Sequence, residues 1–334
     1  MQDQQTGSNA SGPTRVLITG GTGSVGVSFM ETYPDDFAYH TVSRNAEAPL
    51  PSCQAYAADI RDRDALTRVF LDVRPDIVVH AAAMKHVNQA ELQPSQAVEI
   101  NILGTLNVIK ACLAAQVPVA VAISTDKACQ PENIYGYTKR ITEQIWLEHH
   151  CAQTRFVCAR FANVAASAGS VIPIWLRAAL SGDTLKLTDS RMNRLMFSAE
   201  EASALVRTAA DHAAAVDVPF VLVRKMKSVN MLQLANAISA DFGDGRAPET
   251  VGLRPGERLN ETLVSDAELE FAYEAEDGEH IMLHSDALGS QRLKRELSSL
   301  TAEYMSEDEI RMLYLAYAES LKARDIVSVR RGTG

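Results

Sequence analysis

Two short runs of reactive side chains lie near the middle of the chain. Thr125, Asp126 and Lys127 follow an apolar run, and Tyr135 and Lys139 come shortly after them. A tyrosine and a lysine four residues apart share one face of a helix, so the cation of Lys139 is expected to lower the pKa of the Tyr135 phenol. A phenol activated in this way can take a proton from a hydroxyl group while hydride leaves the same carbon. A surface helix with a solvated lysine would show the same spacing, but the neighbouring motifs favour catalysis.

A glycine-rich turn near the amino terminus is the second chemical signal. It has a GxxGxxG spacing and joins an expected strand at 15–19 to an expected helix at 25–33. The first glycine permits a tight turn, the second lets the backbone approach a pyrophosphate, and the third allows close packing of helix on strand. A glycine-rich turn without a ligand is the alternative, which the order of strand, motif and helix disfavours. The residues expected to bind a dinucleotide here are Gly20, Thr22, Gly23, Ser24, Val25 and Gly26.

The form of the dinucleotide is indicated by the end of the second expected strand, 38–43. It ends in Ser43 and Arg44 instead of an acidic residue. Arginine suits the 2′-phosphate of NADP, whereas an acid would bind the 2′-hydroxyl of NAD, so NADP is predicted over NAD. A solvated loop arginine is the alternative. Asp59 and Ile60 are expected beside the adenine, although Asp59 would equally serve as a helix cap. A smooth floor for the cofactor, or plain core packing, is expected from Ala81, Ala82 and Ala83.

These residues must be positioned by a parallel sheet. Short β-branched runs alternate with helical patterns through the first half of the chain, which is the order of parallel strands joined by crossover helices. Further strands are expected at 76–80, 117–124 and 156–160, and further helices at 62–73, 94–116 and 135–149. The predicted fold is therefore α/β, a Rossmann-type doubly wound parallel sheet with a smaller C-terminal substrate-binding lobe.

The division of the chain into domains follows from a change in the pattern of strands and helices after Asn163. From there on the predicted segments are short and are broken by glycine and proline. Residues 1–13 are expected to be a disordered leader. Residues 14–164 form the NADP-binding Rossmann domain, completed by 196–224, where a strand at 219–224 rejoins the sheet. Residues 165–195 and 225–330 form the substrate-binding lobe, which includes a helix at 306–322 opened by Ser306.

Composition excludes several classes of protein. The net charge is −10 without a long basic block, which disfavours nucleic acid as a partner. We find no signal peptide and no apolar run of about 18 to 20 residues, so no membrane association is predicted. The five cysteines contain no CxxC pair, which argues against disulfides and against a metal site. A cytoplasmic location is therefore expected.

Six motifs give the chain a wider resemblance. They are GGTGSVG at 20–26, AAMKHV at 82–87, NILGT at 101–105, STDKA at 124–128, GSVIP at 169–173 and RPGER at 254–258. With them the chain resembles the extended short-chain dehydrogenase/reductase family, and within it the polysaccharide-biosynthesis branch that includes the inverting UDP-N-acetylglucosamine 4,6-dehydratases. The Thr-Asp-Lys triplet distinguishes the inverting dehydratases from the retaining ones, because the retaining enzymes carry an acidic residue where this chain has Lys127.

This resemblance implies a reaction and a role for each residue. Tyr135 would act in oxidation at C4 of a nucleotide sugar, with Thr125 hydrogen-bonded to the C4 oxygen. Lys127 would remove the C5 hydrogen, with its pKa lowered by a desolvated, cation-rich site. Asp126, with its pKa raised by burial, would protonate the departing C6 hydroxyl. An epimerase or ketoreductase acting on a related nucleotide sugar, and a non-enzymatic scaffold, are the alternatives.

The resemblance also implies a substrate site and an assembly. Lys85 and His86 are expected to line the sugar site, with Lys85 also within reach of the cofactor. Departures from the branch pattern lie in the substrate-binding lobe, so the exact sugar and nucleotide stay open. A homo-oligomer, dimer or hexamer, is expected through the helices at 94–116 and 135–149. The residues expected around the nucleotide diphosphate are Asn163, Ser170, Val171, Arg194, Arg254, Glu257 and Arg258, with Glu261 orienting the arginines.

Overall fold

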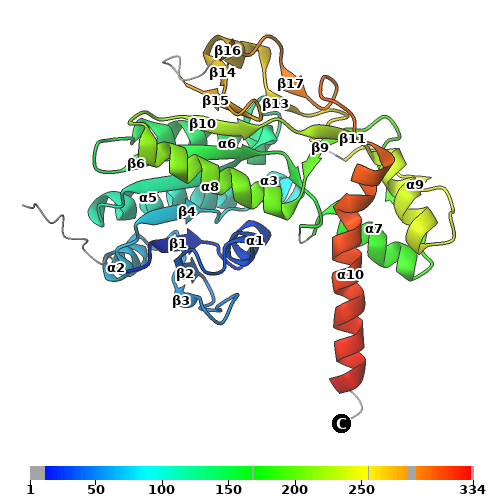
Figure 1. Cartoon of the computed structure of the whole chain (residues 1–334), viewed down its shortest axis with the longest axis horizontal. Helices are drawn as coiled ribbons and strands as arrows, with labels where there is room; N and C mark the ends of the chain where they lie inside the picture. Colours follow the sequence, from blue (N-terminus) through cyan, green and yellow to red (C-terminus); the bar gives the residue numbers. More distant parts are fainter. Residues whose placement is uncertain (1–11, 168, 255, 285–290, 332–334) are drawn as a thin grey trace, which may run out of the picture.

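A ten-stranded sheet forms the centre of the protein (Figure 1). The computed structural model describes residues 12–167, 169–254, 256–284 and 291–331, with residues 320–331 described by their backbone alone. The strands of this sheet are β1 (Arg15–Thr19), β2 (Ala38–Ser43), β3 (Gln54–Ala57), β4 (Ile77–His80), β5 (Val119–Thr125), β6 (Arg155–Phe161), β10 (Val221–Arg224), β14 (Ala272–Glu274), β15 (His280–Leu283) and β16 (Gln291–Arg292). Their order across the sheet is β16-β14-β15-β10-β6-β5-β4-β1-β2-β3.

The parallel part of the sheet has the order of a doubly wound fold. β1 lies between β2 and β4 and runs parallel to both, with Thr19 aligned to Val42 on one side and to His80 on the other. Strand order therefore reverses at β1, and ligands of such sheets bind beside this point, at the carboxyl ends of the strands. Val16, Leu17 and Ile18 of β1 are fully buried, as a strand covered on both faces requires. The predicted fold class is confirmed.

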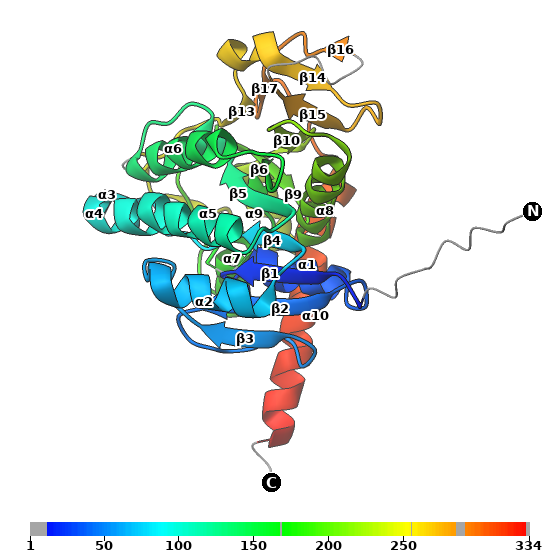
Figure 2. The ribbon, with the colours of Figure 1, turned by 90° about the vertical axis from the view of Figure 1, so that its left-hand side faces the viewer.

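Helices cover both faces of the sheet, and Figure 2 shows the two layers from the side. α1 and α8 pack against each other on one face, and α2, α5 and α6 cover the other. Their bounds are α1 (Ser24–Thr32), α2 (Arg63–Val73), α5 (Gly104–Ala114), α6 (Ile134–Glu148) and α8 (Ala199–Ala215).

The long helix predicted at 94–116 contains a widened turn. It runs through α4 (Pro94–Ala97) and the π-helical stretch η1 (Val98–Leu103) into α5. Within η1 the buried side chain of Asn101 accepts a hydrogen bond from the backbone N–H of Met84 at 2.8 Å and donates to Thr138 Oγ1 at 2.9 Å. Asn101 therefore ties the loop after β4 to α6, which explains why this helix departs from regular α geometry.

The same stretch, Pro94–Ala114, is long and apolar enough to cross a membrane by length and composition, with a mean hydropathy of 1.4. This differs from the expectation that no run is long enough. Of this window 44% is buried inside the protein, where α5 packs on α2 and α6. The core helix of a globular protein passes the same test, so the criterion is weak evidence for a membrane span.

A buried ion cluster fixes β13 (Thr262–Val264) against the sheet. The Nη2 atom of Arg160, a fully buried residue of β6, lies 2.8 Å from Glu143 Oε2 and 2.9 Å from Glu268 Oε1. Arg160 Nη1 also donates to the backbone oxygen of Leu263 at 3.0 Å. Removing one partner of such a cluster would leave an uncompensated buried charge. The cluster therefore holds the segment that follows residue 261 in one position.

The smaller lobe has its own sheet and its own core. Its three-stranded sheet has the order β11-β9-β7, and Leu176, Leu234 and Tyr314 are among the fully buried residues of its apolar cluster. Figure 1 shows α10 packed beside this lobe and then extending away from the body. α3 (Val87–Leu92) packs on α6, and β17 (Leu297–Ser298) pairs with β13, so both accompany the main sheet. The elements of the lobe are β7 (Asn163–Val164), α7 (Val171–Leu180), β8 (Lys186–Leu187), β9 (Asn193–Phe197), β11 (Lys227–Asn230), α9 (Met231–Phe242), β12 (Glu249–Thr250) and α10 (Glu307–Arg331).

The chain is divided differently from the expectation in one respect. The sequence assigned 225–330 to the substrate-binding lobe, but β15 pairs antiparallel with β10, and β14 and β16 extend the main sheet further. These strands are short, so their alternation of polar and apolar residues was too brief to be recognised. α10 begins directly after Ser306, with three acids in its first turn, as predicted, and its backbone continues to Arg331. Most of the predicted leader, 1–11, lies outside the described residues.

Candidate active site

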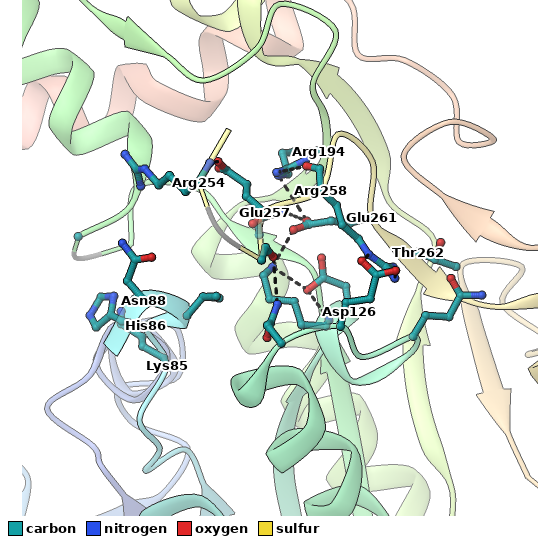
Figure 3. A pocket seen from close by; sticks show the side chains of 18 residues that line it. Lys85, His86, Asn88, Asp126, Arg194, Arg254, Glu257, Arg258, Glu261 and Thr262 are labelled. Carbon is teal, nitrogen blue, oxygen red and sulfur yellow. Dashed lines mark hydrogen bonds and ion pairs between the residues drawn. The ribbon is translucent and has the colours of Figure 1, made fainter. Parts of the chain in front are cut away.

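A polar pocket of about 380 Å³ lies between the carboxyl ends of the strands and the smaller lobe (Figure 3). Figure 3 shows Lys85, His86 and Asn88 on one side of it, and Asp126 with Glu261 on the other. The pocket is therefore built by segments distant in the sequence. Its lining residues are Lys85, His86, Val87, Asn88, Asp126, Lys127, Gln130, Glu132, Asn133, Asn163, Gly169, Arg194, Arg254, Gly256, Glu257, Arg258, Glu261 and Thr262.

The Thr-Asp-Lys triplet lies where β5 ends. Thr125 is the last residue of the strand, and the next two begin the short 3-10 turn η2 (Asp126–Ala128). The Thr125 hydroxyl donates to Asp126 Oδ1 at 2.7 Å, and the backbone N–H of Lys127 donates to the same oxygen at 2.9 Å. Lys127 Nζ lies 3.2 Å from Asp126 Oδ1 and 2.9 Å from Glu261 Oε1. The amine is thus held between two carboxylates.

The pKa of Lys127 corrects one prediction. Its site was expected to be rich in cations and to lower the pKa of the amine. Burial does act in that direction, but the charges of Asp126 and Glu261 outweigh it and raise the pKa of Lys127 above its ordinary value. Burial, together with the nearby charge of Glu261, raises the pKa of Asp126 to about 7, as expected for the acid. Lys127 is therefore cationic in this site, and Asp126 titrates near neutrality.

Tyr135 and Lys139 lie on the first turns of α6, close to the triplet. A Cβ at Gly136 would lie 2.5 Å from the backbone oxygen of Lys127, so only glycine lets α6 begin directly against η2. Burial raises the pKa of Tyr135 to about 12, and the charge of Lys127 and the Thr125 hydroxyl oppose this. Lys139 Nζ instead donates to the backbone oxygen of Ile123 at 2.6 Å. The prediction that Lys139 lowers the pKa of Tyr135 is therefore wrong: this pKa is raised, and the cation that opposes the rise is Lys127.

The three arginines expected at the diphosphate differ in the contacts that they make with other residues of the protein. Arg194 is buried, and its guanidinium donates to the backbone oxygens of residues 193, 258 and 259 at 2.8 to 3.1 Å. It therefore holds the pocket loop in place. Arg258 forms an ion pair with Glu132 at the pocket wall. Arg254 is exposed, and its backbone N–H donates to Glu257 Oε2 at 3.1 Å, so Glu257 shapes the loop.

The other residues expected at the substrate lie at different depths. Lys85 and His86 line the pocket and are exposed at its surface. The protein still removes part of the water from around the Lys85 amine, and this partial desolvation lowers the pKa of Lys85. Asn163 Nδ2 donates to Glu261 Oε2 at 3.0 Å. Ser170 and Val171 open α7 and are absent from the described pocket lining, although Ser170 Oγ is buried with no hydrogen-bond partner among the described residues.

The glycine-rich turn forms a cradle at the switch point of the sheet. Gly20 has a φ of +69°, and a Cβ there would lie 2.9 Å from the Cα of Ala82, so the turn requires glycine. No side chain caps the amino end of α1, whose first turn therefore presents backbone donors. Thr22 and Gly23 are exposed at this turn, and Gly26 is buried against the backbone of Gly21. Such an end of a helix suits a pyrophosphate.

The other residues expected at the cofactor lie along the same edge. Ser43 ends β2, and the exposed Arg44 follows it. The pKa of Asp59 is lowered, mainly by hydrogen bonds from Arg61 and in part by the charge of Arg44. Asp59 does not cap a helix, because Asp62 takes that position in α2. Ile60 is buried, and the partly buried run after β4 lies beside the glycine turn, namely Ala81, Ala82 and Ala83.

Several pocket residues were not identified from the sequence. Asn133 caps α6 and donates to the backbone oxygen of Gly256 at 3.2 Å, which joins the two sides of the pocket. Glu132 pairs with Arg258, and Gln130 and Thr262 complete the wall. Asn133 had a sequence signal, because asparagine is a preferred cap before a helix. The others had none, since their partners lie far away in the chain.

The fold and the site together define the class of protein. The doubly wound sheet, the glycine cradle, and the tyrosine and lysine on α6 are those of an extended short-chain dehydrogenase/reductase. A family model described as polysaccharide biosynthesis protein matches residues 16–283. The chain therefore belongs to this polysaccharide biosynthesis family.

Individual proteins resemble the chain over most of its length. An inverting UDP-N-acetylglucosamine 4,6-dehydratase of Campylobacter jejuni is 32% identical over 280 residues, which cover 78% of this chain and 80% of that protein. A UDP-glucose 4-epimerase of Rickettsia canadensis is 30% identical over 272 residues, covering 76% and 78%. The X-ray structure of Pen from Bacillus thuringiensis has a TM-score of 0.81 at 28% identity and covers 91% of this chain and 97% of its own. The chain thus belongs to the superfamily of sugar-nucleotide dehydratases and epimerases.

Proposed function

We propose that the protein is a nucleotide-sugar 4,6-dehydratase that inverts C5 of a UDP-N-acetylglucosamine-like substrate and uses NADP. The observation that carries this proposal is the buried Asp126–Lys127 pair, which lines the polar pocket directly beside Tyr135. Oxidation and reduction at one carbon need only the tyrosine. Water elimination also requires a base and an acid, and an amine next to a carboxyl group with a pKa near neutrality supplies both.

The cofactor site of the chain fits a dinucleotide. The cradle at Gly20 and the uncapped amino end of α1 suit the pyrophosphate, and Arg44 lies where a 2′-phosphate would need a cation. Tyr135 and Lys139 belong to the first turns of α6, which follows β5 and the turn η2, and they would meet the ribose and the nicotinamide. When bound, NADP would accept a hydride from the sugar and later return it.

The residues around the sugar would move three protons. Burial raises the pKa of Tyr135, so this phenol must first ionise; the phenolate then takes the proton of the C4 hydroxyl as hydride leaves C4, which gives a ketone at C4 and acidifies the C5 hydrogen. Lys127 is cationic at rest, so it must first give up a proton, and the carboxyl group of Asp126, whose Oδ1 lies 3.2 Å from Nζ, accepts it. This transfer leaves a neutral amine beside a protonated acid. The amine then removes the C5 hydrogen, and Asp126 protonates the C6 oxygen, which departs as water.

A second candidate function is a 4-epimerase, because the epimerase of Rickettsia canadensis is 30% identical to this chain. Such a reaction would use Tyr135 and the dinucleotide in the same way and would leave C6 intact. It gives no role to the buried Asp126–Lys127 pair. This pair is the reason for preferring the dehydratase.

The deciding experiment is incubation of the purified protein with UDP-N-acetylglucosamine and NADP in heavy water. We expect a product lighter by one water, with one solvent deuterium at C5, because the hydrogen removed there exchanges with solvent. Mass spectrometry reads both, and proton coupling constants read the configuration at C5. A product isomeric with the substrate would establish the epimerase instead. Absence of any product with a panel of nucleotide sugars would contradict both enzymatic functions.

The preference for NADP gives a separate prediction. Arg44→Asp should change the ratio of the Kd values for NADP and NAD by about 10- to 100-fold in favour of NAD, because a charge-assisted phosphate contact is lost and a repulsive carboxylate is gained. Titration of the cofactor followed by fluorescence gives both Kd values. Arg63→Asp is the matched control, since Arg63 is an exposed arginine of α2 outside the cradle. An unchanged ratio in Arg44→Asp would show that Arg44 is only a solvated loop residue.

A further inference from the structure

A third ionisable side chain completes the contacts around Asp126 and Lys127. Glu261 Oε1 lies 2.9 Å from Lys127 Nζ, and the Glu261 side chain is only 9% exposed. Asp126 is fully enclosed. Glu261 comes from the segment that precedes β13, which is remote from the pair in sequence, and it lies on the same side of the pocket as Asp126 (Figure 3). Two carboxyl groups that are themselves almost completely buried thus share one amine.

The two oxygens of Asp126 have different surroundings. Oδ1 accepts hydrogen bonds from the Thr125 hydroxyl, the Lys127 backbone N–H and Lys127 Nζ, at 2.7, 2.9 and 3.2 Å. Oδ2 is buried and receives no hydrogen bond from the described part of the chain. A protonated carboxyl keeps one oxygen as acceptor and carries the proton on the other. Oδ2 is therefore the atom of Asp126 that carries a proton.

Glu261 is the group that favours protonation of Asp126. Its charge, and the hydrogen bond it accepts from the protonated carboxyl, add to burial in raising the pKa of Asp126, and Lys127 opposes them. The charges of Lys127 and Arg194 hold the pKa of Glu261 below its usual range despite burial. Glu261 therefore keeps the negative charge, and Asp126 takes the proton. The other polar groups that face this trio are Thr125 of β5, Tyr135 of α6, Asn163 of β7, and Arg258.

We propose that Glu261 is a positioning residue of the Asp126–Lys127 pair, which holds the amine against Asp126 and determines how many protons the pair carries. The inference rests on the proposed dehydratase function, in which the pair holds one proton, on Asp126, when the amine attacks. A pair with two protons has no base. The rate of water elimination therefore increases as the pH rises, because the Asp126–Lys127 pair loses its second proton. Glu261 determines the pH at which this proton is lost.

Glu261→Gln tests the proposal through the pH profile of water elimination. Removing the carboxylate lowers the pKa of Asp126, so the rise of the profile should move to lower pH by at least about one unit. The rate on the plateau should fall about 10- to 100-fold, because the amine loses its second contact. Glu261→Asp keeps the charge and should leave the rise near its wild-type position. Glu270→Gln removes an exposed carboxylate outside the site and is the matched control.

Infrared spectroscopy supplies a readout that does not need activity. The carbonyl band of a protonated carboxyl should persist to near-neutral pH in the wild-type protein, vanish in Asp126→Asn, and titrate at lower pH in Glu261→Gln. A band that titrates near pH 4 in the wild type, or an unmoved profile in Glu261→Gln, overturns the role of Glu261. If the wild-type protein eliminates no water, the dehydratase function fails, but the infrared titration still decides whether Glu261 holds the proton on Asp126.

Discussion

Lys127→Ala is expected to lower the rate of water elimination by about 10²- to 10⁴-fold, because Lys127 is the only lysine of the described residues that pairs with Asp126 and Glu261. Lys127 is the cation held 2.9 and 3.2 Å from the two carboxylates of the site. Dinucleotide binding should survive, since the glycine cradle and Arg44 do not contact this residue. Product mass and deuterium uptake at C5 measure the elimination, and cofactor fluorescence measures the binding.

Lys127→Arg is the matched variant that separates charge from base. Removal of the amine by alanine leaves two buried carboxylates without their cation, which is expected to cost about 3 to 5 kcal/mol of stability. Arginine keeps the positive charge but does not lose its proton in proteins, so it can pair with Asp126 and cannot act as a base. We therefore expect a stable protein that binds NADP and eliminates no water. Elimination at wild-type rates in Lys127→Arg would contradict the role of the amine.

Tyr135→Phe should lower the rate of every step by about 10²- to 10⁴-fold, because oxidation at C4 precedes elimination. The substitution removes only the hydroxyl from a buried ring that packs with Met84, Ala90 and Ala97, so the fold should be kept. Stopped-flow absorbance of the reduced cofactor measures oxidation directly. In Lys127→Arg, by contrast, this absorbance should still appear, because that variant stops after oxidation.

Tyr137→Phe is the control for this experiment. Tyr137 lies on the same helix, α6, but it is 51% exposed, whereas Tyr135 is buried. Its loss removes the same hydroxyl from the opposite side of the helix, and turnover should stay at the wild-type level. Equal losses in the two variants would mean that α6, and not the phenol of Tyr135, limits the reaction.

Local sequence patterns were sufficient to predict those parts of the fold and site that are encoded in one continuous segment. The run from β1 through the glycine turn into α1 could be predicted, because an apolar strand, a turn that needs a positive φ at Gly20 and an apolar helix follow one another directly. The triplet at Thr125 and the tyrosine at the start of α6 were likewise recognisable. Each of these positions depends on neighbours in sequence, which is the information that spacing contains.

Contacts between distant segments could not be predicted in the same way. The antiparallel strands β14–β16 are short and lie at the edge of the sheet, so no periodicity marked them. The π-helical turn at Asn101 exists because this side chain bonds to Met84 and Thr138, which belong to other elements. Neither Arg194 nor Arg258 could be recognised as engaged by protein, because the partners of both are brought together only by folding.

The amino-acid order was enough to establish a doubly wound α/β sheet, a family and the residue types of the reaction, because each of these is encoded in short contiguous stretches. The ionisation of those residues depended on folding. The pKa of Lys127 is raised and not lowered because its amine lies 3.2 Å from Asp126 and 2.9 Å from Glu261, a residue of a remote segment. Electrostatic interactions vary with distance and burial, and neither quantity can be read from a linear chain.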